Sequence, residues 1–70
     1  MKYLIVIEQT GTGYSAYSPD IAGCVATGRT REEAEREMKS ALTFHFEGMR
    51  SEGLTPPTPH SSSSYVEVPA

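Results

Sequence analysis

The chain has 70 residues, of which 37% are hydrophobic, and its formal net charge is −3. A chain of this length forms one domain, and its core is marginal because it buries only about 60% of the surface that it exposes when unfolded. Its six basic residues are scattered, so it lacks the clustered positive charge that nucleic-acid binding requires.

The N-terminal residues predict a strand and a hairpin turn. Residues 2–8 form a β-branched and aromatic stretch that is typical of a strand. Apolar side chains occur at both odd and even positions, which predicts a central strand covered on both faces. Gly11 and Gly13 follow, and they predict a hairpin turn in which glycine supplies positive φ.

Two shorter strands are expected next. Residues 14–18 predict the second strand, and Pro19 ends it because proline has no backbone N–H for the ladder. Asp20 favours a local turn in which its own carboxylate caps the backbone. Residues 24–27 predict the third strand, which Gly28 ends.

A helix is predicted over residues 31–52. Thr30 and Glu33 have the spacing of a capping box, and Gly53 is expected as the C-terminal capping glycine. At 100° per residue, one apolar stripe forms and Phe44 falls outside it. The stripe consists of Ala34, Met38, Ala41, Leu42, His45 and Met49, with Phe46 at its edge.

The remaining residues predict a surface connection and a last strand. Residues 54–64 are rich in proline and serine and are expected to run extended over the surface. Residues 65–68 alternate and predict a fourth strand, placed beside the first strand and parallel to it. The expected fold class is therefore α+β, with β-β-β-α-β order and one long helix on one face of a single sheet.

The stretch from residue 17 to residue 34 resembles the HicB-like antitoxin family. The family's loop motif corresponds here to Pro19, Asp20, Gly23, Cys24 and Gly28, followed by Thr30, Glu32, Glu33 and Ala34. A glycine and prolines after the helix, and then a short strand, are also similar to this family. The resemblance implies a partial ribonuclease-H-like fold that binds and blocks a small, basic HicA-type toxin, a ribonuclease that cleaves mRNA.

Many members of that family carry a further C-terminal DNA-binding domain. This sequence ends at Ala70, directly after the predicted last strand. We therefore expect no direct DNA binding by these residues alone.

Carboxylates raise the alternative of a degenerate metal-dependent nuclease. A ribonuclease-H-like site needs converging carboxylates around divalent metal ions. The candidates are Glu8 on the first strand, Glu33 or Glu37 on the helix, and Glu67 on the last strand. Glu33 is already explained by its role in capping the helix, and Glu37 by its place on the solvated flank of the helix. We therefore predict no catalytic, metal or cofactor site.

One cysteine and two histidines raise the second catalytic alternative, a thiol nucleophile. Cys24 with His45 or His60 could form one, but nothing nearby in sequence orients such a pair. We expect Cys24 to pack as a small hydrophobe and His45 to be a core or interface residue. His60 is expected to be exposed.

Association is the expected way to stabilise so small a domain. One cysteine cannot form an internal disulfide and the sequence has no structural zinc motif, so we expect a homodimer or tetramer. No export signal or apolar run of membrane-helix length occurs, so we expect a cytoplasmic protein with no membrane partner. A stand-alone oligomeric adaptor with another partner remains the alternative to an antitoxin.

Overall fold

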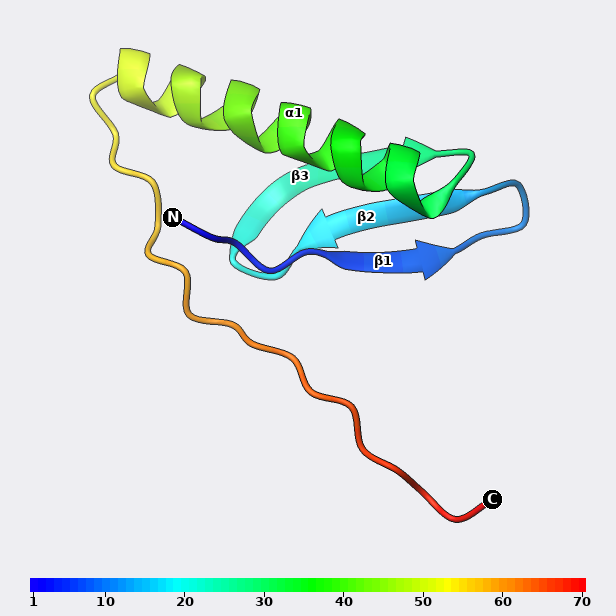
Figure 1. Cartoon of the computed structure of the whole chain (residues 1–70). Helices are drawn as coiled ribbons and strands as arrows, with labels where there is room; N and C mark the ends of the chain where they lie inside the picture. Colours follow the sequence, from blue (N-terminus) through cyan, green and yellow to red (C-terminus); the bar gives the residue numbers. More distant parts are fainter.

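The computed structural model describes all 70 residues, and it contains three antiparallel strands followed by one long helix (Figure 1). The strands are β1 (Val6–Gln9), β2 (Tyr14–Ser18) and β3 (Ile21–Gly28), in the sheet order β1-β2-β3. The helix α1 (Arg31–Ser51) lies across one face of this sheet. The expected α+β class is confirmed.

The first strand is shorter than predicted and lies at the edge of the sheet. β1 begins at Val6, which pairs with Tyr17 of β2, rather than at residue 2. Before β1, the carbonyl oxygen of Leu4 accepts a hydrogen bond of 2.8 Å from the hydroxyl of Ser18, the last residue of β2. The sequence-based expectation of a central first strand is wrong, since the central strand is β2.

The third strand is longer than predicted. It begins at Ile21 instead of residue 24 because Ile21 already pairs with Ser18, directly after a two-residue turn. The second strand coincides with the predicted range of residues 14–18.

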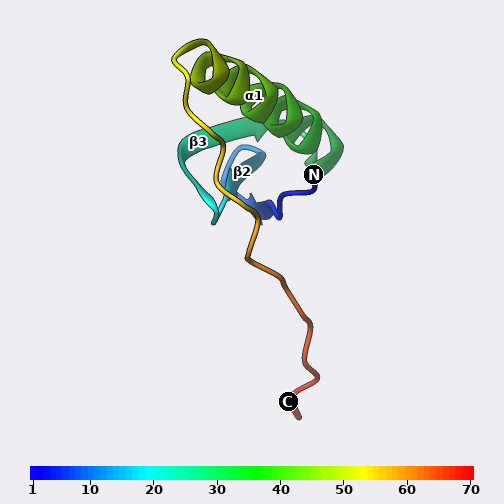
Figure 2. The ribbon, with the colours of Figure 1, turned by 90° about the vertical axis from the view of Figure 1, so that its left-hand side faces the viewer.

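The predicted fourth strand at residues 65–68 is not formed. Residues 54–70 are neither helix nor strand, and beyond Ser61 the chain leads away from the sheet (Figures 1 and 2). A strand needs a hydrogen-bonded neighbour, and no other part of the chain pairs with these residues. An alternating sequence alone therefore does not make residues 65–68 a strand within this one chain.

The core lies between α1 and the inner face of the sheet. Its buried hydrophobic residues are Ala16, Ile21, Cys24, Ala34, Met38 and Leu42. The helix approaches β3 so closely that a Cβ atom on Gly28 would overlap the backbone of Ala34. As the helical period predicted, Phe44 lies outside the core, with 79% of its surface exposed. The helix does not contain the apolar stretch that crossing a membrane would require.

Both ends of α1 are capped. The Thr30 hydroxyl oxygen accepts a hydrogen bond of 3.1 Å from the backbone N–H of Glu33, while the Glu33 carboxylate accepts from the N–H of Arg29 rather than Thr30. The helix ends at Ser51, one residue before the predicted end. Gly53 follows with φ of 76°, the left-handed conformation that a glycine adopts after a helix end.

The hairpin turn between β1 and β2 needs the small size of Gly13 rather than a glycine with positive φ. Neither Gly11 nor Gly13 has a positive φ, so that part of the expectation is wrong. The backbone N–H of Thr10 donates to the carbonyl oxygen of Gly13 over 2.8 Å, which closes the turn. A Cβ atom on Gly13 would overlap the carbonyl oxygen of Gly28, so the two strand ends can approach only because this residue is small.

Candidate protein-binding surface

An apolar row crosses the sheet face that α1 does not cover. The register pairs Val6 with Tyr17 and Tyr17 with Val25, so these three side chains stand side by side. Tyr17 is 40% exposed and Val25 is 70% exposed. Cross-strand rows of this kind normally pack against another layer, so this face can receive a partner.

A shallow apolar groove continues from this row around the outer edge of β3. This β3 groove has a volume of about 470 Å³ and lies between β3 and one flank of α1. Its lining residues are Gly23, Cys24, Val25, Ala41, Phe44, His45, Gly48, Met49 and Glu52. Phe44 and Val25 are exposed hydrophobic residues that both line it, which makes the groove a candidate contact site for another protein.

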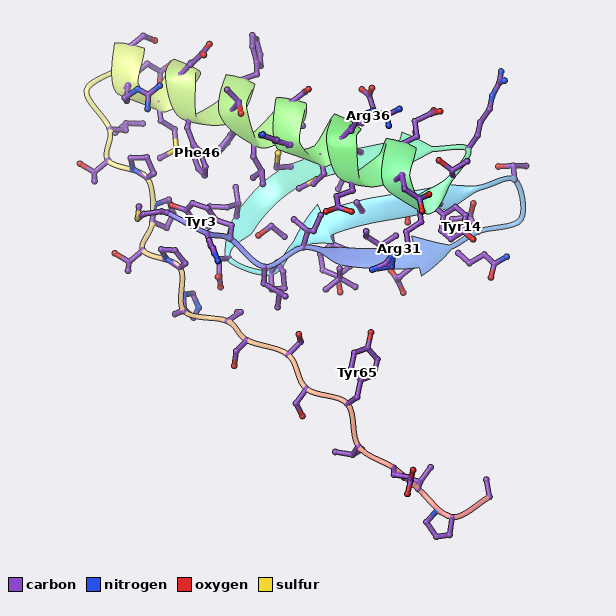
Figure 3. The ribbon with its side chains drawn as sticks, in the orientation of Figure 1. Tyr3, Tyr14, Arg31, Arg36, Phe46 and Tyr65 are labelled. Carbon is purple, nitrogen blue, oxygen red and sulfur yellow. The ribbon has the colours of Figure 1, made fainter.

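A larger groove lies on the other flank of α1, next to the N-terminal residues that lead into β1. This β1 groove has a volume of about 810 Å³. Its apolar lining includes Tyr3, Ile5, Leu42 and Phe46, and charged side chains of α1, Arg36 and Lys39 among them, line the helix side. Tyr3 and Phe46 pack together with ring centroids 5.0 Å apart (Figure 3).

The buried carboxylate of Asp20 ties the segment after the helix to the sheet. One of its oxygens accepts hydrogen bonds of 3.1 Å from the backbone N–H groups of His60 and Ser61. The other oxygen accepts a hydrogen bond of 2.6 Å from the Ser61 hydroxyl and lies 3.3 Å from the His60 Nε2 atom. The Tyr3 hydroxyl adds a hydrogen bond of 2.6 Å to the carbonyl oxygen of Pro57. We call the Asp20, His60 and Ser61 contacts the Asp20 latch.

The latch keeps Asp20 ionised. The Ser61 hydroxyl lowers the pKa of the Asp20 carboxyl, and the two backbone N–H groups and His60 act in the same direction, although burial opposes them. The turn predicted at Asp20 is formed, but the carboxylate accepts hydrogen bonds from residues 40 and 41 positions away instead of from the local backbone. His60 is exposed as expected, with 75% of its side chain accessible, but its backbone is anchored.

Asp20→Asn should release residues 57–61 from the sheet, because it replaces the charged carboxylate that accepts three hydrogen bonds with a neutral amide. We expect the slow hydrogen exchange of the His60 and Ser61 amides to be lost at pH 7. In the wild type, a lowered pKa means that the latch is complete above the usual carboxyl pKa of about 3.9 and opens as the pH falls through the lowered value.

Ser61→Ala is the matched control for this prediction, since it removes one of the three hydrogen bonds and keeps the carboxylate. Its amides should retain part of their protection. Equal protection in the wild type and Asp20→Asn would show that the proline-rich segment, rather than Asp20, holds the tail in place.

The four candidate carboxylates are not gathered into one site. Glu8 is exposed on β1, Glu33 caps α1, Glu37 lies exposed on α1, and Glu67 is in the exposed tail. No group of three or more His, Cys, Asp or Glu side chains is placed to hold a metal ion.

Cys24 and His45 do come together, as lining residues of the β3 groove. Burial raises the pKa of the Cys24 thiol, so it stays protonated at neutral pH and is a poor nucleophile. His45 is half-buried and meets the ring of Phe46 edge-on at 5.9 Å. Both residues therefore contribute to the packing of the groove.

The comparisons with known proteins agree with the sequence motif. The family described as "HicB_like antitoxin of bacterial toxin-antitoxin system" matches residues 3–70. The chain belongs to this HicB-like antitoxin family. Antitoxin HicB 2 of Photorhabdus laumondii is 35% identical over 71 residues, which cover 100% of the chain and 51% of that protein.

An uncharacterized 14.9 kDa protein of Haemophilus phage HP1 is 36% identical over 69 residues, covering 99% of the chain and 52% of the phage protein. The chain thus spans about half the length of these curated relatives. Among solved structures, a chain in a HicA3 and HicB3 toxin-antitoxin complex matches with a TM-score of 0.72 and 33% identity. That match covers 86% of this chain and 70% of the other.

Proposed function

We propose that this chain is a cytoplasmic antitoxin that neutralises a small, basic, mRNA-cleaving toxin of the HicA type by binding it in a fixed ratio. The observation that carries the proposal is the match to a chain from a complex of HicA3 with HicB3. At 33% identity and a TM-score of 0.72, this chain shares its backbone fold with a chain of that complex, which supports the proposal that it binds a related partner.

The β3 groove is the surface that we assign to the toxin. Phe44 on α1 and Val25 on β3 offer two exposed hydrophobic side chains that line the same groove. Interface energy concentrates in a few such apolar or aromatic anchors surrounded by polar residues. The net charge of −3 would speed the encounter with a basic toxin, while the groove would keep the complex together.

We infer that neutralisation occurs by occlusion and not by catalysis. The carboxylates that a nuclease would need are not gathered into a group that could hold a metal ion, and burial raises the pKa of the Cys24 thiol. The 70 residues of this chain would then act by covering the toxin's RNA-binding surface. We expect no sequence-specific DNA binding from these 70 residues.

The test is a titration of a HicA-type toxin with this chain. RNA cleavage should fall linearly as the chain is added and reach zero at a fixed molar ratio, with an acidic protein of similar charge as the control. The chain alone should not cleave RNA in the presence of magnesium ions. Unchanged toxin activity at a large excess of chain would exclude the antitoxin function and favour the adaptor alternative.

A further inference from the structure

We propose that residues 65–68 of one copy pair as a β-strand with the free edge of β1 in a second copy, each copy supplying its tail to the other. The inference concerns self-association and does not depend on the proposed toxin. It connects two features of the chain: an exposed segment with strand-like composition and a sheet edge with no paired strand.

The donor segment has strand character without a partner. Tyr65 is 100% exposed, Val66 81% and Val68 67%, and the segment stands clear of the sheet and helix (Figure 3). β-branched and aromatic residues at this density are typical of a strand that packs on one face. Leaving all three side chains in water forgoes the burial that a chain this small needs.

The acceptor edge lies beside the larger groove. β1 pairs with β2 on one side only, so the backbone N–H and C=O groups on its outer side have no sheet partner. An exposed edge of this kind is a template for an added strand. The outer edge of β3 is a poorer template, because Gly23 interrupts its regular backbone with φ of 77°.

The alternation of the tail fits the two faces of this edge. A strand added here would direct Val66 and Val68 to one face and Tyr65 and Glu67 to the other. The valines would enter the β1 groove, whose floor contains Ile5 and Leu42. Tyr65 would then extend the apolar row that Val6, Tyr17 and Val25 form on the open face.

The Asp20 latch favours a second copy over the chain's own edge. Asp20 directly precedes β3, the strand farthest from β1, and the latch holds Ser61 beside it. With strands about 4.8 Å apart, a strand beyond β1 would lie about 14 Å from β3. The four residue steps from Ser61 to Tyr65 span at most about 14 Å when fully extended. The chain's own tail would therefore need its whole reach, fully extended, for the strand to begin at Tyr65.

A twofold arrangement removes this difficulty. The tail already points away from its own body, and two chains that exchange tails satisfy both free edges at once. The exchange supplies the fourth strand that the sequence predicted, but from another copy.

Sedimentation of the full chain tests the association. The wild type should be a dimer at tens of micromolar, and the double variant Val66→Asp with Val68→Asp should be a monomer. Ser62→Asp with Ser64→Asp adds the same charge to the same tail outside the strand, so this control should stay dimeric. A monomeric wild type, or a dimer that survives the valine substitutions, would overturn the proposal.

Disulfide trapping tests which chain supplies the strand. In a Cys24→Ala background, Glu8→Cys marks β1 and Glu67→Cys marks the tail, and both positions are exposed. Mixing the two single-cysteine proteins under oxidising conditions should give a crosslinked heterodimer, whereas Glu47→Cys on α1 should not link to the tail. A chain carrying both cysteines that closes into a disulfide-bonded monomer would show that each tail pairs with its own sheet, and the exchange would be excluded.

Discussion

Met38→Ala is expected to remove a large part of the protein's free energy of unfolding at 25 °C. Met38 has no exposed surface and is the largest fully buried side chain, in the middle of α1 between Ala34 and Leu42. Truncating a buried methionine to alanine costs about 2–5 kcal/mol, the lost transfer energy plus the cavity left behind. At about 0.05–0.15 kcal/mol per residue, a chain of 70 residues has only about 4–10 kcal/mol of stability.

Urea unfolding followed by circular dichroism measures this effect. Met38→Leu is the matched control, because a swap that conserves volume should cost less than about 1.5 kcal/mol. A Met38→Ala midpoint equal to that of the wild type would mean that the packing of α1 on the sheet contributes little stability.

Features set by local sequence were predictable. The second strand coincides with residues 14–18, and α1 ends one residue before the expected position. The helical period also placed Phe44 outside the core, because it depends only on the geometry of 100° per residue. An apolar residue outside the core stripe of the helix was the feature of the sequence that could have indicated the β3 groove.

Features set by distant partners were not predictable. Residues 65–68 have the composition of a strand, but whether they form one depends on which edge is within reach. Asp20 and Ser61 are 41 residues apart, and a serine-rich segment carries no mark that one of its hydroxyls will meet a buried carboxylate. The outer edge of β1 is exposed because residues 65–68, which were expected to pair with it, do not form a strand in this chain.

Phe44→Asp is expected to weaken toxin binding by at least about 30-fold while leaving the fold intact. The side chain is 79% exposed, so its removal costs the isolated chain little. In the proposed complex it would be an aromatic anchor of the β3 groove, and loss of such an anchor costs about 2 kcal/mol or more, at 1.4 kcal/mol for each tenfold change in affinity. Calorimetric titration with a catalytically inactive toxin gives the affinity, and circular dichroism checks the fold.

The control variants separate the loss of an anchor from the effect of charge. Phe44→Leu keeps an apolar side chain in the β3 groove and should retain most of the affinity. Thr43→Asp adds the same charge one residue away but on the flank that lines the β1 groove, so it should bind the toxin nearly as the wild type does. If Thr43→Asp abolished binding and Phe44→Asp did not, the toxin would occupy the β1 groove, where it would compete with the exchanged tail, and raising the toxin concentration would then dissociate the dimer.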